Sequence, residues 1–154
     1  MFYFVVVLLV ALDQITKVLA QHMLYEVTTF PVIPNVLHFT YVENRGIAFG
    51  LFQNMNYIFL PLSILITIGC FYFLNRAWKK RKWFISWGIA LIASGAIGNI
   101  LDKVFRGFVV DFIQVKLIDF PVFNIADILV SVGTVMVAIA ILFLENGEKN
   151  ENQL

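Results

Sequence analysis

Charged residues are scarce in this chain. Asp, Glu, Lys and Arg make up 14% of its 154 residues, whereas about 25% is usual for soluble domains. Hydrophobic residues make up 60%, and the mean hydropathy is +0.86. An ordinary soluble domain is therefore excluded. The net charge of +1 argues neither for nor against nucleic acid by itself, and no nucleic-acid partner is expected.

Cysteine and histidine are also rare. Cys70 is the only cysteine, so no disulfide can form within the chain and no thiolate cluster can bind a metal. The two histidines, His22 and His38, match no zinc motif. We therefore expect no metal and no cofactor.

Long stretches with few or no charges are abundant, and four of them are long enough to cross a bilayer, which takes about 20 apolar residues. They predict helices at about 2–20, 57–75, 83–101 and 125–144. The expected fold is an α-helical integral membrane protein with a single domain over residues 1–154. We expect the first span to be retained rather than cleaved, because it lacks the basic start of a signal peptide.

Basic residues gather between the second and third spans. Residues 76–82 include five basic side chains and no acidic one. By the positive-inside rule, this short loop is predicted to be cytoplasmic. Both termini, including the tail at 145–154, would then be cytoplasmic, and segments 21–56 and 102–124 would be extracytoplasmic.

The first extracytoplasmic segment has the composition of β-strands. Residues 27–44 are rich in β-branched and aromatic side chains and are interrupted by Pro31 and Pro34. We expect a small extracytoplasmic β-sheet on the membrane surface, with an apolar face that covers helix ends or a lipid-bearing ligand. Residues 44–50 follow, with glycines that allow tight turns and apolar residues that could enter the bilayer edge. A plain loop into the second span explains this segment equally well.

Polar residues reappear at the end of the third span. Asn99, Asp102 and Lys103 have the i, i+3, i+4 spacing that places them on one helix face. An ion pair at the level of the lipid headgroups would explain Asp102 and Lys103 equally well. Asn99 lies deeper and should have a specific partner, because an unpaired amide in an apolar environment is costly. Small residues before it allow another helix to approach closely, namely Ser94, Gly95, Ala96 and Gly98.

Two aspartates, Asp111 and Asp127, stand sixteen residues apart near one predicted membrane edge. Asn124 and Asp127 resemble a capping box at the start of the fourth span, which would explain Asp127 without any catalytic role. Asp111 is flanked by apolar residues and has no capping role. Near the start of the chain, Asp13 either forms an ordinary pair with Lys17 at i+4 or supports a neighbouring site.

A pair of carboxylates in a poorly solvated site can supply an acid and a base together. Both cannot easily ionise, so one keeps a proton while the other stays charged. In peptide hydrolysis, the ionised carboxylate takes a proton from water and the protonated one hydrogen-bonds to the scissile carbonyl. Asp111 and Asp127 therefore predict an acid–base pair that could carry out such a hydrolysis, and the residues alone leave its substrate open.

Five segments in order resemble the bacterial lipoprotein signal peptidases, or signal peptidase II: DQITK from Asp13, NRGIAFG from Asn44, GNILDK containing Asn99, VVDFI containing Asp111, and FNIAD ending at Asp127. The resemblance covers nearly the whole chain. It implies an aspartyl peptidase of the bacterial plasma (inner) membrane that removes signal peptides from prolipoproteins after diacylglyceryl modification, cleaving immediately before the lipidated cysteine.

The same resemblance implies roles for individual residues. Asp111 and Asp127 take the places of the catalytic pair. The positions that would bind substrate or support the site are Asp13, Asn44, Gly46, Asn99, Asp102, Lys103 and Asn124. The expected partners are lipid-modified prolipoprotein signal peptides and membrane phospholipid, and a monomer is expected. Two positions depart from the family, since Lys103 and Ile128 stand where arginine and serine are common, and ammonium and guanidinium groups are not equivalent.

Other functions remain open at this point. A Ser/Lys peptidase would use Ser94 or Ser86 with Lys103. Ser94 lies nine residues before Lys103, about 13 Å along a helix at 1.5 Å per residue, which is too far for a hydrogen bond.

Two further alternatives are not peptidases. A small ion-coupled transporter or channel subunit would use Asp13, Asn99 and Asp127 as a polar pathway. A membrane assembly factor would need none of the aspartates.

Overall fold

The structure is a computed structural model of the whole chain, and it describes residues 1–46, 56–118 and 120–144. Residues 47–50, predicted to form a turn at the bilayer edge, and the tail at 145–154 lie outside the described residues. The described elements are α1 (Phe2–Leu24), β1 (Thr29–Ile33), β2 (Leu37–Asn44), α2 (Asn56–Lys79), α3 (Trp83–Phe105), β3 (Val109–Val115), α4 (Ile125–Ile139) and a short π-helix, η2 (Ala140–Leu144).

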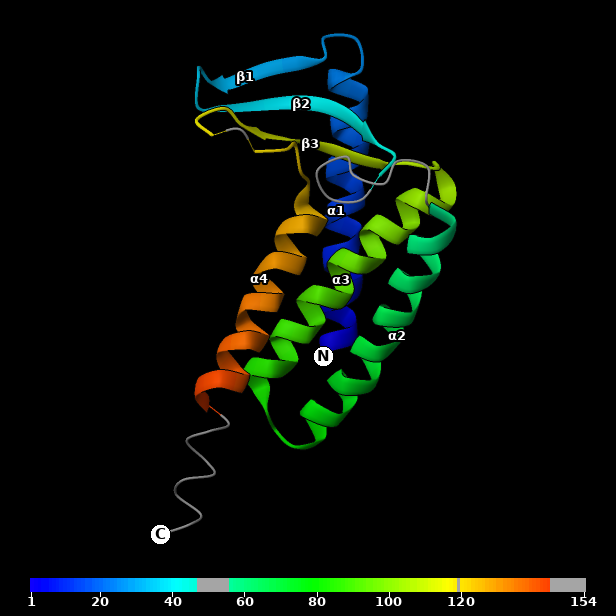
Figure 1. Cartoon of the computed structure of the whole chain (residues 1–154), viewed down its shortest axis with the longest axis vertical. Helices are drawn as coiled ribbons and strands as arrows, with labels where there is room; N and C mark the ends of the chain where they lie inside the picture. Colours follow the sequence, from blue (N-terminus) through cyan, green and yellow to red (C-terminus); the bar gives the residue numbers. More distant parts are fainter. Residues whose placement is uncertain (47–55, 119, 145–154) are drawn as a thin grey trace.

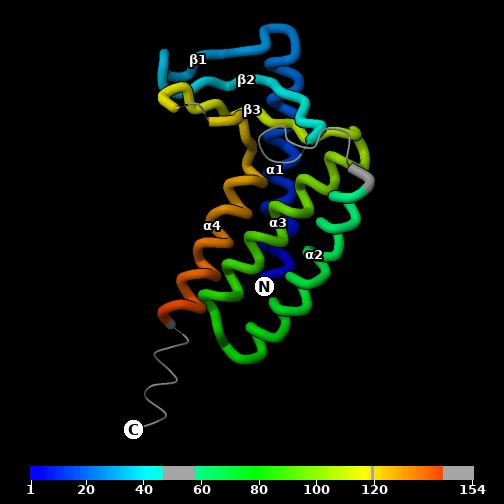
Figure 2. Tube along the Cα trace, viewed as in Figure 1, coloured from blue at the N-terminus to red at the C-terminus, as the bar shows by residue number. Residues whose placement is uncertain are grey.

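The helices form a bundle with a small sheet at one end (Figures 1 and 2). Four described helices are long and apolar enough to cross a membrane. Helix α3 contacts α1, α2 and α4, and 44% of its most apolar stretch is buried, against 11% to 22% for the others. The predicted fold class, four membrane-spanning helices with a small β-sheet, is confirmed.

Helices α1, α2 and α3 each continue four residues beyond their predicted ends. The prediction ended each span where polar residues begin, but helices continue into the headgroup region, where polar side chains reach water. Arg76 and Lys79 therefore lie in the last turn of α2 and not in a loop, and Asp102 and Lys103 lie in α3 and not in the following segment. The last predicted helix divides into α4 and η2.

The sheet is antiparallel, with strand order β1-β2-β3. The hairpin of β1 and β2 comes from the segment with strand-like composition, but β3 was missed by the sequence prediction. In the register of β2 and β3, Asp111 is opposite Val42. Ala20 and Leu24 of α1 form an apolar cluster with Val110 and Phe112 of β3, and this contact holds the strand that carries Asp111 over the end of the bundle.

Glycines bring α3 and α4 into close contact, as the run of small residues predicts. A Cβ atom on Gly95 would overlap the carbonyl oxygen of Ala126, and one on Gly98 would overlap the carboxylate of Asp13. By contrast, a Cβ atom on Gly69 of α2 would have no described heavy atom within 4 Å. The first two glycines are therefore required by packing, and Gly69 is not.

Gly95→Ala should destabilise the protein by about 1–3 kcal/mol, because the added methyl group overpacks the interface of α3 with α4. Gly69→Ala is the matched control, and it should leave stability unchanged or raise it by up to about 1 kcal/mol, since alanine favours helix over glycine. Thermal unfolding of both variants in detergent measures the difference. Equal unfolding temperatures would show that the close contact at Gly95 has no energetic weight.

Candidate active site

A buried ion cluster joins α1 to α3 at the sheet end of the bundle. The Nζ atom of Lys17 lies 2.9 Å from Oδ2 of Asp13 and 3.1 Å from Oδ2 of Asp102, and all three side chains are fully buried. Arg106, four residues after Asp102, donates to Oδ1 of Asp102. The two carboxylates are thus balanced by two cations. The predicted pair of Asp13 with Lys17 is present as part of a larger network.

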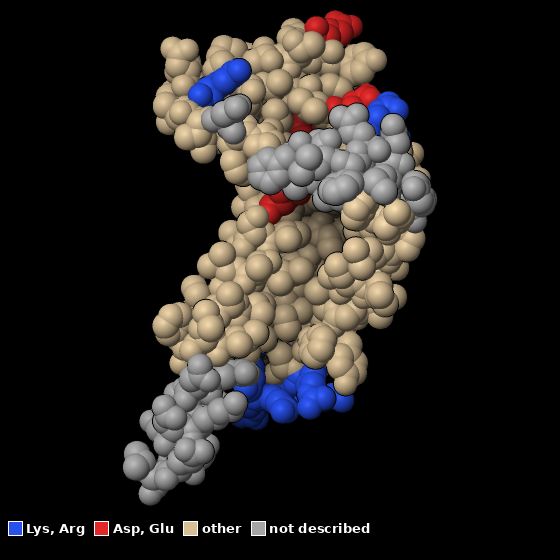
Figure 3. Space-filling view, viewed as in Figure 1, with Lys and Arg blue, Asp and Glu red and all other residues tan. Residues whose placement is uncertain are grey.

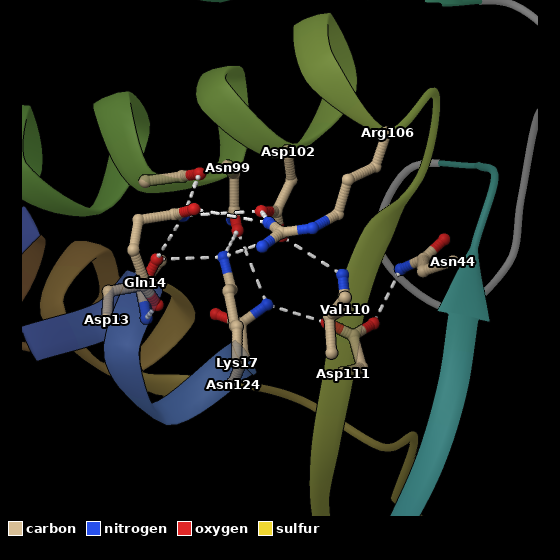
Figure 4. Close-up of polar contacts among 12 residues, drawn as sticks. Asp13, Gln14, Lys17, Asn44, Asn99, Asp102, Arg106, Val110, Asp111 and Asn124 are labelled. Carbon is tan, nitrogen blue, oxygen red and sulfur yellow. Dashed lines mark hydrogen bonds and ion pairs between the residues drawn. The ribbon is translucent and has the colours of Figure 1, made fainter. Parts of the chain in front are cut away.

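The carboxylates of this cluster also hold backbone groups from the last part of the chain. Oδ1 of Asp13 accepts a hydrogen bond from the backbone N–H of Ala126 at 2.9 Å. Oδ2 of Asp102 accepts one from the backbone N–H of Val110 at 3.1 Å (Figure 4). Ala126 precedes Asp127, and Val110 precedes Asp111. The cluster therefore positions the two segments that carry the predicted dyad.

Asn99 connects the ion cluster to Asp127. Its Oδ1 atom accepts from Nζ of Lys17 at 2.9 Å, and its Nδ2 atom donates to Oδ1 of Asp127 at 2.9 Å. An ammonium group can only donate, so the oxygen of the amide must face Lys17 and the NH₂ group must face the carboxylate. This is the specific partner expected for Asn99.

Asn124 both caps α4 and links the two aspartates. Its Oδ1 atom accepts from the backbone N–H of Asp127 at 3.0 Å, and Oδ2 of Asp127 accepts from its backbone N–H at 3.1 Å, which completes the predicted capping box. Its Nδ2 atom donates to Oδ1 of Asp111 at 2.6 Å. Asp127 can therefore cap α4 and belong to the carboxylate pair at the same time.

Asn44, at the end of β2, holds the other oxygen of Asp111. Its Nδ2 atom donates to Oδ2 of Asp111 at 2.9 Å. Its own Oδ1 atom accepts from the backbone N–H of Gly46 at 3.0 Å, which fixes the orientation of the amide. Asn44 and Gly46 thus act on Asp111 as one unit, and Figure 4 shows Asn44 approaching Asp111 from the neighbouring strand.

The two aspartates differ in their surroundings. Asp111 is 2% exposed, whereas Asp127 is only partly buried. Burial raises the pKa of Asp111 to about 7, and the negative charge of Asp127 acts in the same direction. Hydrogen bonds from Asn44 and Asn124, and the charge of Lys17, oppose this rise. Since Asp111 lies close enough to feel the charge of Asp127, the arrangement can supply an acid and a base near neutral pH.

Lys103 lies beside the pair and is partly buried. Both carboxylates act on it electrostatically, but within the described part of the chain it makes no direct hydrogen bond or ion pair. Lys103 differs in this respect from Lys17 and Arg106, whose ammonium and guanidinium groups are held by carboxylates.

Sequence reasoning did not assign Gln14, Lys17 and Arg106 to the site. Gln14 donates from Nε2 to the backbone oxygen of Gly98 at 3.1 Å and to Oδ1 of Asp102 at 3.2 Å, and its Oε1 atom accepts from Arg106 at 3.1 Å. Two signals could have found these residues. Gln14 and Lys17 share a short polar motif with Asp13, and Arg106 follows Asp102 at i+4.

The serine alternative has no support in the geometry. The Oγ atom of Ser94 donates to the backbone oxygen of Ala90 at 2.7 Å, and that of Ser86 donates to the backbone oxygen of Lys82, the N-cap residue of α3, at 2.8 Å. Each hydroxyl is thus hydrogen-bonded to its own helix and is not activated by a lysine. Residues 1–46, 56–118 and 120–144 also contain no group of three His, Cys, Asp or Glu side chains that could hold a metal ion.

Known proteins match the chain over most of its length. The family model described as signal peptidase (SPase) II matches residues 5–143. The chain is 47% identical to the lipoprotein signal peptidase of Clostridioides difficile (strain 630), over 95% of the chain and 97% of that protein. It is 36% identical to the lipoprotein signal peptidase of Streptococcus pneumoniae (strain ATCC BAA-255 / R6), over 90% of each.

A solved structure also shares the fold. It is described as a bacterial membrane enzyme, its TM-score is 0.80 at 33% identity, and the match covers 92% of this chain and 87% of that one. The family model and the solved structure thus both match most of the chain. The chain belongs to the signal peptidase II family, a family of aspartic peptidases.

Proposed function

We propose that this protein cleaves the signal peptides of prolipoproteins with Asp111 and Asp127 as its catalytic pair. One observation carries the assignment. Asn124 donates to Asp111 through its side chain and to Asp127 through its backbone, so a single residue holds both carboxylates at one site. Transport, the alternative function, has no support from the family.

The two carboxylates take complementary roles in peptide hydrolysis. The pair titrates as a unit, and it keeps one proton up to about pH 7 because burial raises the pKa of Asp111 to about 7. The ionised carboxylate takes a proton from a water molecule, and the protonated one donates a hydrogen bond to the scissile carbonyl oxygen as it becomes tetrahedral. The ammonium group of Lys103, which lacks a direct partner among the described residues, would stabilise the developing negative charge.

The proposed substrate carries a diacylglyceryl group on the cysteine that follows the scissile bond. The sheet supports this because it exposes Phe30, Ile33 and Phe39, which offer apolar surface beside the bundle. The acyl chains would reach the site from the bilayer without crossing water. We propose that the enzyme acts as a monomer in the bacterial plasma membrane.

The basic residues between α2 and α3 give the orientation that we propose. By the positive-inside rule they favour a cytoplasmic location for that end of the bundle, which would make both termini cytoplasmic and bring the dyad near the extracytoplasmic face. The test uses single cysteines at the exposed positions Lys116 and Lys79 in a Cys70→Ala background. An impermeant maleimide should label Lys116→Cys in intact cells, with the outer membrane permeabilised where one is present. It should label Lys79→Cys only after the plasma membrane is opened, and the reverse pattern would invert the topology.

Asp111→Asn and Asp127→Asn should each lower the rate of cleavage by at least about 10²–10⁴-fold, the usual contribution of general acid–base catalysis. The assay is a gel shift with a diacylglyceryl-modified prolipoprotein and its unmodified twin. Glu26→Gln, which neutralises an exposed carboxylate at the same end of the molecule, is the matched control and should retain full activity. Activity in either dyad variant would refute the assignment, and equal cleavage of the unmodified twin would remove the lipid requirement.

The pH profile should fall as the pH rises through about 7, because the pair then loses its last proton. The hydrogen bond from Asn44 lowers the pKa of Asp111 by stabilising its ionised form. Asn44→Ala should therefore move the basic limb of kcat/KM to higher pH, even where the overall rate is reduced. Thr40→Val, on the same strand as Asn44, removes a hydrogen bond to Gln114 of β3 and should leave the limb in place. A shift to lower pH in Asn44→Ala would contradict the proposed role of Asp111.

A further inference from the structure

A groove runs along the bundle at the end opposite the sheet, away from the dyad. Its volume is about 690 Å³, within the range of roughly 300–1,000 Å³ that is typical of ligand sites. Its walls are apolar and come from α2, α3 and α4, with Ile66, Ile92 and Val137 among them. Arg76, Lys80 and Lys82 also line it, and Figure 3 shows the Lys and Arg side chains gathered at this end.

The groove has the length of one leaflet of the bilayer. On α2, its lining runs over ten residues from Arg76 to Ile66, about 15 Å at 1.5 Å per residue. On α3 and its N-cap residue, the lining runs over the same distance, from Lys82 to Ile92. The hydrocarbon core of a bilayer is about 30 Å thick. The groove therefore extends from the basic end of the bundle to the middle of the membrane and stops there.

The helices leave this space unfilled. Gly69 lines the groove, and a Cβ atom added to it would meet no described heavy atom within 4 Å. This differs from the glycines between α3 and α4, where a Cβ atom would overlap a neighbour. The positive-inside rule explains the basic residues by themselves, but it does not explain an open apolar groove that begins at them.

The apolar groove and its basic entrance together limit the kinds of molecule that could bind there. A signal-peptide helix needs about 20 residues and the full thickness of the membrane, and its basic n-region would lie against like charges here. An anionic phospholipid has a chain that spans one leaflet and a phosphate that complements the cations. We propose that this groove binds an anionic diacyl phospholipid, with an acyl chain between α2 and α4 and the phosphate at Arg76 and Lys80.

The charge requirement can be tested with two double variants that carry equal charge. Arg76→Gln with Lys80→Gln removes two cations that line the groove, whereas Lys79→Gln with Arg81→Gln removes two neighbouring cations that do not. Native mass spectrometry of the full-length protein in detergent measures retained phosphatidylglycerol against phosphatidylcholine. Wild type should prefer phosphatidylglycerol, and the first variant should bind it about thirtyfold less well while the second changes little. Equal loss in both variants, or no preference in wild type, would reduce the effect to general surface charge and overturn the site.

The groove itself can be tested with Gly69→Leu, which places a side chain in the open space. This variant should lose retained phosphatidylglycerol while its unfolding temperature and its cleavage of a lipidated prolipoprotein stay at the wild-type level. Gly69→Ala is the matched control and should keep most of the lipid. Full lipid retention in Gly69→Leu would overturn the proposal. A raised KM for the prolipoprotein with lipid retention unchanged would assign the groove to the signal peptide instead.

Discussion

The buried ammonium group of Lys17 is the interaction on which the rest of the structure depends. It lies in a region with no exposure to solvent, where an unpaired charge would cost several kcal/mol. Two carboxylates and one amide oxygen surround it, from Asp13, Asp102 and Asn99. The carboxylates in turn hold the backbone before each aspartate of the proposed catalytic pair. One charge on the first helix thereby sets the positions of two segments that lie about a hundred residues later in the chain.

The site uses each polar group for two purposes, which explains how so few of them suffice. Asp127 belongs to a capping box, and its Oδ1 atom also accepts from Asn99. Asn124 caps the same helix and also donates to Asp111. Burial and the negative charge of Asp127 raise the pKa of Asp111, so the pair can keep one shared proton. Structural and catalytic explanations of these residues are therefore complementary.

Much of this arrangement follows from the sequence, and the parts that do not follow depend on contacts between distant segments. Hydropathy predicts the four spans, and the scarcity of charge makes Asp13, Asp111 and Asp127 conspicuous. Strand β3 was missed because a short apolar run does not distinguish a strand from a helix. The helix ends were predicted too early because hydropathy indicates which residues lie in the bilayer core, and the helices continue beyond it. The hydrogen bonds that Gln14 and Arg106 make across the bundle could not be predicted from the sequence. The only hints there are the polar residues close to them in the chain.

The small residues of α3 connect helix packing to the chemistry of the site. Asp13 can reach the backbone of Ala126 only because α1, α3 and α4 approach closely, and a Cβ atom at Gly98 would overlap the Asp13 carboxylate itself. A larger residue there would displace Asp13 and, with it, the start of α4. Because Asp127 lies in the first turn of α4, its position relative to Asn99 depends on that same approach. The run of small residues in α3 is thus as necessary to the dyad as the polar residues that touch it.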